Sequence, residues 1–442
     1  MKPLRPFDLL AINLYWFSLS FFLNGLGRFI QPVLVAALVA PEIKNTALGV
    51  LTASGLVVAT VVQPLMGAVS DHSTLRWGRR RPFILAGTLL DFGFLVLIGL
   101  SGNYLLLFVA ILLVQFSTNT AHGALQGLIP DLVPPSQRGK AVGVKQFLEF
   151  AGLILTSIIT ARFLDQAQGF FERGQPAQAL GPIFTALGII IALLAVGLVP
   201  TLLWVRERPL GASSENRARP RISDVLRVDV RANGDYFWLL AGRVFILVGL
   251  SVITTFAIYF FSDVVRLPNP VAVTGNLIVT AGLLTLLVTY PAGYLTDRLG
   301  RKPLNLIAGP LAAAAALGLL TVTNRTLFQL GPLAVTDILA YATLLGLASG
   351  VFLSANWTWA TDLIPPAEAG KYLGLANLAN AGSGVLSGFV GGPIIDFFNA
   401  QGPGLGYNVA FLLAAASFLL GTLLMARVRE TRTRPALVPE GV

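Results

Sequence analysis

Long runs of apolar residues recur from one end of the chain to the other, separated by short polar and basic stretches. Most runs reach about 18 residues or more with few charges, the length that a helix needs to cross the hydrocarbon core of a bilayer. The pattern predicts an all-α membrane protein. We expect twelve transmembrane helices, near residues 9–38, 46–69, 82–100, 104–129, 139–163, 181–205, 238–262, 271–296, 303–323, 332–361, 370–398 and 405–427.

Composition and charge agree with this pattern. Of the 442 residues, 55% are hydrophobic and 12% are charged, against about 25% charged residues in a soluble domain. The net charge of +10 comes from lysines and arginines in short loops on one side of the predicted helices. The positive-inside rule makes that side, and both termini, cytoplasmic. We expect a multi-pass protein of the plasma (cell inner) membrane, in contact with lipid and without a nucleic acid partner.

Residue types that catalysis or metal binding would need are scarce. The chain has no cysteine and two histidines, His72 and His122. No metal-ligand cluster, nucleophile–base pair or nucleotide-binding loop is visible in the sequence. We therefore expect neither an enzyme nor a bound metal or cofactor.

Two internal repeats divide the chain into related halves. An apolar run ending at Asp71 and followed by a basic turn returns around Asp297. The segment 131–140 aligns without gaps to 362–371, at a similar spacing along the chain. Parallel repeats of this kind occur in transporters that bind substrate near the middle of the membrane. We expect two pseudo-symmetric six-helix bundles, 1–205 and 237–442, joined by a cytoplasmic linker at 206–236, which is either solvated or a short helix on the headgroups.

The repeated hairpins carry a family resemblance. The second one, Gly293-Tyr294-Leu295-Thr296-Asp297-Arg298-Leu299-Gly300-Arg301-Lys302, resembles the loop motif of the major facilitator superfamily. The first, Val62-Gln63-Pro64-Leu65 to Ser70-Asp71 and then Gly78-Arg79-Arg80-Arg81-Pro82-Phe83-Ile84, resembles the sucrose/proton symporters of the glycoside–cation symporter group. Asn119-Thr120 with Gly123 and Asp131-Leu132 resembles the same group. Where those symporters carry a carboxylate and an arginine in the fourth helix, this chain has Gln115 and Gln126.

The resemblance implies a monomeric transporter with the major facilitator fold that works by alternating access. It also implies that the first hairpin and its second copy form a latch at the cytoplasmic side, which helps to hold the outward-open state. The alternative is a set of solvated surface ion pairs of small energetic value. The latch residues are Asp71, Arg79, Arg80, Arg81, Asp297, Arg298 and Arg301.

Polar side chains inside the predicted helices mark a candidate substrate site, because they are costly in hydrocarbon. In the fourth helix they recur at spacings of three and four residues, which places them on one face. Amide and guanidinium groups can hydrogen-bond sugar hydroxyls, and an indole can pack on a sugar ring. The alternative is that these amides join helices. The candidates are Asn24, Arg28, Gln31, Gln115, Asn119, His122, Gln126, Asn356, Trp357, Asn377 and Asn380.

Two carboxylates within predicted helices are candidates for proton coupling. Glu149 lies one helical turn from Lys145, and a structural ion pair between them is the alternative. Asp91 lies in the third helix, where pairing with a neighbouring helix is the alternative. Arg243 is a further polar residue inside a predicted helix, the seventh, and the family resemblance implies that this helix lines the cavity.

We expect a secondary active transporter that moves a small polar solute, a sugar or glycoside, in symport with protons. The alternatives are an exporter or facilitator of a non-sugar metabolite or drug, and a receptor that binds without transport. The run from Phe150 to Thr160 lacks the Gly-Pro signature associated with drug/proton antiporters.

Overall fold

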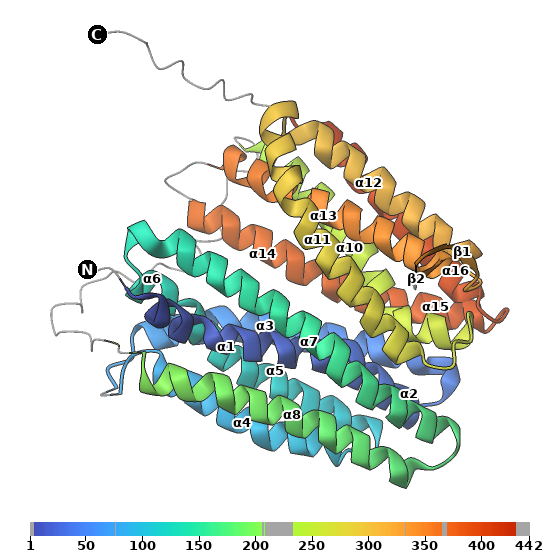
Figure 1. Cartoon of the computed structure of the whole chain (residues 1–442), viewed down its shortest axis with the longest axis horizontal. Coiled ribbons are helices and arrows are strands. Elements are labelled where there is room, and N and C mark those ends of the chain that lie inside the picture. Colours follow the sequence, from blue (N-terminus) through green and yellow to red (C-terminus); the bar gives the residue numbers. More distant parts are fainter. Residues whose placement is uncertain are drawn as a thin grey trace. The chain divides into compact units, whose positions relative to one another are not determined.

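The computed structural model describes residues 4–75, 77–205, 207, 233–331, 333–364 and 369–429, and most of them are helical (Figure 1). Within these residues, twelve helical segments are long and apolar enough to cross a membrane, which confirms the predicted number. The helices are α1 (Pro6–Gly25), α2 (Gln31–Leu38), α3 (Lys44–Asp71), α4 (Arg81–Gly99), α5 (Tyr104–Gln126), α6 (Leu128–Leu132), α7 (Arg138–Glu172), α8 (Pro176–Leu203), α10 (Gly234–Asp263), α11 (Pro270–Leu299), α12 (Arg301–Gly318), α13 (Asp337–Leu363), α14 (Ala369–Leu386), α15 (Gly392–Asn399) and α16 (Leu405–Ala426).

Helices suit this chain because lipid offers no hydrogen-bond partner to the backbone, and a helix satisfies its own N–H and C=O groups. Two segments of the described chain contain a short π-helical turn. Leu26–Ile30 joins α1 to α2, and Ser387–Gly391 joins α14 to α15. Side chains cap other helix ends: the Asn103 oxygen accepts a 2.9 Å hydrogen bond from the Leu106 N–H at the start of α5.

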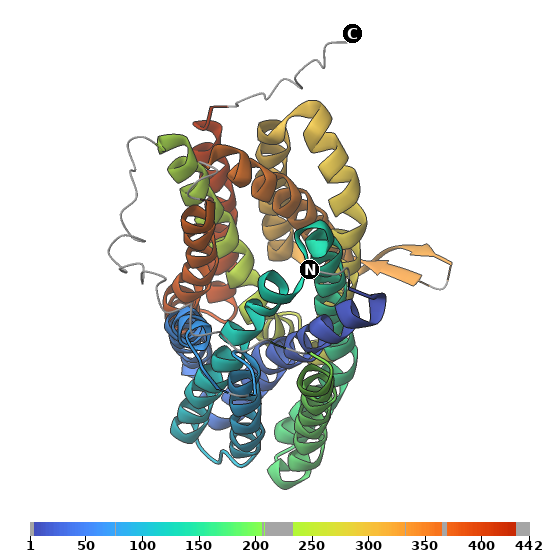
Figure 2. The same cartoon turned by 90° about the vertical axis from the view of Figure 1, so that its left-hand side faces the viewer.

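Several predicted helix boundaries are wrong. The fifth helix is predicted to end at residue 163, but α7 continues to Glu172, and the sixth is predicted to begin at residue 181, but α8 begins at Pro176. The apolar pattern predicts that the tenth helix begins at residue 332, but α13 begins at Asp337. The residues before it form an antiparallel hairpin of β1 (Thr326–Leu330) and β2 (Leu333–Thr336), which extends away from the helices in Figure 2. Asp337 closes its base, because the Asp337 N–H donates to the Arg325 carbonyl at 3.0 Å. The apolar residues of β2 lead directly into α13, and a short apolar run does not reveal whether it is strand or helix.

The chain divides into two compact units, each assembled from several segments of sequence. Unit 1 comprises Met1–Arg219, Ser251–Gly282 and Ala381–Phe411, and unit 2 comprises Pro220–Leu250, Leu283–Asn380 and Leu412–Val442. Most of the predicted linker, 206–236, lies outside the described residues.

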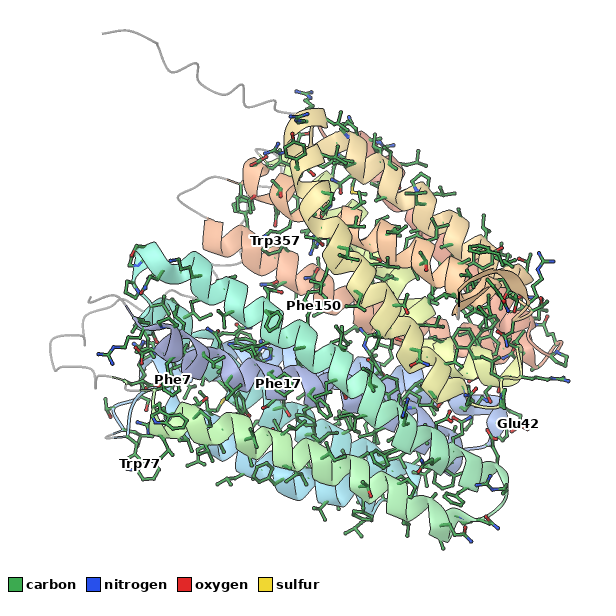
Figure 3. The ribbon with its side chains drawn as sticks, viewed as in Figure 1. Phe7, Phe17, Glu42, Trp77, Phe150 and Trp357 are labelled. Carbon is green, nitrogen blue, oxygen red and sulfur yellow. The ribbon has the colours of Figure 1, made fainter. Side chains whose placement is uncertain are left out.

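Unit 1 is built on close helix packing. Its α1 packs against α7 and α8, and α5 packs against α3 and α4. Figure 3 shows the two ends of these helices: Phe7 and Trp77 lie at one end, and Glu42 lies at the other. The basic hairpin between α3 and α4 is therefore at the opposite end from the start of α3.

Candidate functional site

The first polar cluster of unit 1 is arranged around Trp16 on α1. The Lys145 Nζ of α7 lies 3.9 Å from the centroid of the Trp16 ring. The His122 ring of α5 meets the same indole edge-on, at a centroid distance of 5.2 Å. Lys145 also pairs with Glu149 at 3.6 Å. The structure thus brings together two predicted site residues, His122 and Glu149, with an indole that the sequence analysis did not single out.

A stripe along α1 continues from this Trp16 cluster. The Arg28 Nε donates to the Asn24 Oδ1 at 3.0 Å, and the Asn24 Nδ2 donates to the Ser20 carbonyl at 2.9 Å. The Ser20 hydroxyl donates to the Glu149 carbonyl at 2.7 Å. Trp16, Ser20, Asn24 and Arg28 follow one another every four residues, so this spacing was the missed signal.

Gln31, the last candidate of the first segment, takes part in a contact between helices. Its side chain is buried, and its Oε1 accepts a 3.4 Å hydrogen bond from the Thr52 hydroxyl of α3. This contact matches the alternative in which an amide joins two helices.

The predicted stripe on α5 forms hydrogen bonds mainly along its own helix. The Asn119 Nδ2 donates to the Gln115 carbonyl at 2.7 Å and reaches the Gln115 Oε1 at 3.2 Å. The Gln126 Nε2 lies 3.4 Å from the His122 Nε2. In the described part of the chain, no hydrogen bond ties Gln115, Asn119 or Gln126 to another helix, although Gln115 packs against Gly55 of α3.

A second polar cluster lies in unit 2, around Arg243 of α10. Its Nη1 donates to the Asn356 Oδ1 of α13 at 2.6 Å, and its Nε donates to the Asn380 Oδ1 of α14 at 2.9 Å. The guanidinium carbon lies 5.6 Å from the centroid of the Trp357 ring. Arg243 is only 4% exposed. Three predicted candidates thus converge on Arg243, which the sequence placed on a cavity-lining helix without including it among the candidate site residues; we call this group the Arg243 cluster.

The neighbours of the Arg243 cluster differ in accessibility. Trp357 is 39% exposed, whereas Trp359 is 2% exposed and its indole nitrogen has no partner among the described residues. The two indoles therefore lie on different faces of α13. Asn377 is exposed on α14, one turn before Asn380.

Asp91 is separate from the Glu149 carboxylate and occupies the contact between α4 and α5. The Ser117 and Thr118 hydroxyls both donate to its Oδ1, the latter at 2.7 Å. Asp91 is 1% exposed, and its Oδ2 has no hydrogen-bond partner among the described residues. No lysine or arginine of the described chain forms an ion pair with it, so its contacts are those of a helix–helix partner.

The first hairpin is organised around Arg80. This side chain is 5% exposed and pairs with both Asp71 and Asp131, the latter at 3.1 Å. Its Nη1 donates to the Ser70 hydroxyl at 2.7 Å, and Arg79 also pairs with Asp131. The Arg81 Nη1 instead donates to the Trp77 carbonyl at 3.3 Å.

The second hairpin repeats part of this arrangement. The Arg301 Nε donates to the Asp362 Oδ2 at 2.9 Å. Arg298 lies over the Tyr294 ring at 4.5 Å. The Asp297 side chain lies outside the described part of the structure. Asp131 and Asp362 each pair with a hairpin arginine of their own half, and they are the first residues of the repeated segments, so the internal repeat contained this signal.

Comparisons with known proteins identify the family to which this chain is similar. The sequence profile of the Major Facilitator Superfamily matches residues 17–387 and 269–441. The "D-xylose-proton symporter-like 3, chloroplastic" of Arabidopsis thaliana is 25% identical over 386 residues, covering 78% of this chain and 67% of that protein. The "Sugar efflux transporter A" of Dickeya chrysanthemi is 25% identical over 418 residues, covering 92% of this chain and 94% of that protein.

The sucrose resemblance has a counterpart in a shorter match. The "Sucrose transport protein SUC3" of Arabidopsis thaliana is 27% identical over 192 residues, covering 37% of this chain and 31% of that protein. Among solved structures, the crystal structure of a D-xylose-proton symporter shares the fold, with a TM-score of 0.72 at 17% identity over 97% of this chain and 99% of that one. The twelve apolar helices and the profile match confirm the predicted fold class, and this multi-pass membrane protein belongs to the Major Facilitator Superfamily.

Proposed function

We propose that this chain is a secondary active transporter that moves a sugar or glycoside by alternating access and couples this movement to protons. The observation that carries the proposal is the Arg243 cluster, where a guanidinium, two amides and a half-exposed indole converge from three helices. Directional donors with an aromatic face suit a solute that is rich in hydroxyls. Relatives named as sugar/proton symporters and sugar transporters support this substrate class.

The residues of unit 1 supply a second set of groups for the same substrate class. Trp16 offers an indole beside Lys145 and His122, and Asn24, Arg28, Asn119 and Gln126 offer amide and guanidinium groups. We propose these groups as the solute-binding residues of unit 1, and Asn356, Trp357, Asn377 and Asn380 as the solute-binding residues of unit 2. Gln31 and Gln115 are the weakest members of the predicted set, because Gln31 bonds to α3 and Gln115 bonds within α5.

For proton coupling we propose Glu149 before Asp91. Glu149 is partly exposed and adjoins the Trp16 cluster through Lys145, so a proton on its carboxylate can influence groups that bind the solute. Asp91 is enclosed between α4 and α5 and is held by two hydroxyls, which suits a packing role.

For the hairpins we propose a latch on the cytoplasmic side. Arg80 and Arg301 each bind the acid at the end of the matching helix in their own half, which stiffens each hairpin. We further propose that 1–205 and 237–442 are the moving bundles, that 206–236 is a linker between them, and that the protein is a monomer of the plasma (cell inner) membrane with cytoplasmic termini.

A second candidate is export of a sugar. It is favoured by the match to a protein named as a sugar efflux transporter, which extends over 92% of this chain. The purified protein in proteoliposomes distinguishes the candidates. We expect radiolabelled sugars or glycosides to accumulate when a pH gradient drives protons in the same direction. Accumulation only when protons move in the opposite direction would establish an exporter, and equilibration without dependence on pH would establish a facilitator. Failure of all sugars to cross would refute the substrate class.

A further inference from the structure

Two carboxylates in unit 1 each bind the start of a helix from the opposite half of the sequence. The Val271 and Ala272 N–H groups, in the first turn of α11, both donate to the Asp165 Oδ1 of α7 at 3.1 Å. The Thr46 N–H, in the first turn of α3, donates to the Asp396 Oδ2 of α15 at 2.6 Å. These N–H groups have no partner within their own helix, and the positive end of a helix favours a negative charge.

The two contacts are equivalent under the internal repeat. The spacing in sequence between Asp165 and Asp396 is the same as that between Asp131 and Asp362. Likewise, Thr46 and Ala272 are separated by the spacing that relates the two hairpins at Asp71 and Asp297. Each half therefore supplies one carboxylate and one helix start, and receives the same from the other half.

The helices that carry these contacts also cross closely at two positions, and the internal repeat relates these two crossings. A side chain at Gly49 of α3 would strike the Gly388 carbonyl, and a side chain at Gly275 of α11 would strike the Ser157 carbonyl of α7. Gly49 and Gly275 have the spacing of the two hairpins, and Ser157 and Gly388 have the spacing of the two carboxylates. Close backbone approach thus accompanies each carboxylate contact.

Further polar contacts strengthen the Asp396 side. The Asn45 Nδ2 donates to the Asp396 Oδ1 at 2.8 Å, and Lys44 pairs with Asp263 at 2.6 Å. The Tyr407 hydroxyl donates to the Asp263 Oδ2 at 2.6 Å. The residues at the start of α11 that match Lys44 and Asn45 are Pro270 and Val271, which offer no such side chains.

We propose that Asp165 and Asp396 form a pseudo-symmetric pair of clasps that closes the non-cytoplasmic end of the transporter. The inference rests on the proposed alternating access, because that mechanism requires this end to open in one of the two states. The starts of α3 and α11 are the helix ends that lie away from the basic hairpins, because each of these helices runs from its clasp to its own hairpin. Because the two clasps join the same pair of sequence halves, they are expected to break together.

Pulsed spin-label distance measurements in lipid nanodiscs test the clasps. The chain has no cysteine, so paired cysteine labels can be placed without background. One pair at the exposed residues Glu42 and Gln401 reports on the Asp396 clasp, and one at Gln175 and Pro268 reports on the Asp165 clasp. The matched control is Glu172→Gln, an exposed acid on α7 that bonds to Gln168 in the same helix.

We expect Asp165→Asn to raise the ratio of long to short distances about tenfold, as for the loss of a charge-assisted hydrogen bond. Both label pairs should widen together, although the substitution touches one clasp only. Asp396→Asn should do the same, the double variant should multiply the two effects, and Glu172→Gln should change neither pair. If Asp396→Asn does not fold, Asp165→Asn carries the test, because its side chain is half-buried.

Widening at the substituted clasp alone, or at neither, would overturn the proposal. The outcome is independent of the substrate. Distances that shift as expected in a protein that transports no sugar would reject the proposed substrate and keep the clasps. Unchanged distances in a protein that transports sugar would reject the clasps and keep the proposed substrate.

Discussion

Arg243 and Asn356 are joined by a 2.6 Å hydrogen bond from Nη1 to Oδ1, although 113 residues separate them in the chain. Both side chains are buried, and a guanidinium away from water requires such partners. Asn380 supplies the second acceptor at 2.9 Å. The Arg243 cluster is therefore the natural first target for mutagenesis.

Replacing Arg243 with methionine, which keeps the stem and removes the charge, should weaken substrate binding by about 1–3 kcal/mol, because buried partners lose their donors. Asn380→Leu should act in the same direction. Equilibrium binding of the sugar identified in proteoliposomes measures both. Trp359→Phe is the control, since this indole is buried on another face of α13. Normal affinity in the Arg243 and Asn380 variants would show that the cluster only joins helices and does not bind the solute.

Asn119→Leu should weaken substrate binding by a similar amount, about 1–3 kcal/mol. Its amide bonds only within α5, so the substitution removes no hydrogen bond between helices of the described chain. Gln31→Leu provides the contrast, because Gln31 bonds to Thr52 of α3. We expect lower thermal stability with unchanged affinity for Gln31→Leu. Lower thermal stability with unchanged affinity for Asn119→Leu, together with weaker binding for Gln31→Leu, would show that the α5 stripe does not bind the solute.

Glu149→Gln should abolish uphill accumulation of sugar and preserve exchange of labelled for unlabelled sugar. A glutamine cannot release a proton, whereas exchange requires no net proton movement. Both assays use the same proteoliposomes, with and without an imposed pH gradient. Accumulation by the Glu149→Gln variant would transfer the coupling role to another group, with Asp91 as the next candidate.

Asp91→Asn should lower the folding stability rather than the coupling. Its Oδ1 accepts from two hydroxyls of α5, and an amide NH2 in place of the Oδ2 would be a buried donor without a partner among the described residues, which costs about 1–3 kcal/mol. The melting temperature in detergent should fall, while the transport rate per folded molecule should stay within a few fold. Thr118→Val, which deletes one of the donors, should lower the melting temperature less. Loss of uphill accumulation with intact stability would contradict the packing role.

Asp71→Asn should slow transport and favour opening at the cytoplasmic side, with substrate affinity within a few fold of the parent. Arg80 would lose one of its two acidic partners and keep Asp131. Asp131→Asn should have the larger effect, because both Arg79 and Arg80 pair with Asp131. Label distances across the cytoplasmic loops measure the shift. Unchanged distances and full transport in both variants would remove the latch role.

The twelve spans, the family and the repeat could all be predicted from the sequence. Spans follow from length and hydropathy, which are local properties, and lipid leaves the helix as the only economical backbone conformation. The repeat follows from two spacings that can be counted in the chain. The same reasoning failed at residues 333–336, where a short apolar run forms the strand β2, and a strand of that length has no distinct apolar period.

Which polar residues meet could not be predicted, because their meetings depend on the distance and rotation between helices. Helical spacing places Asn119 and Gln115 on one face of α5, but it does not connect Arg243 to Asn356, Lys145 to Trp16, or Asp165 to the start of α11. Distance and rotation are set by the packing of small residues such as Gly49 and Gly275, where a single side chain would prevent the backbones from approaching. Packing of that kind is a property of two surfaces, and no single segment of sequence contains it.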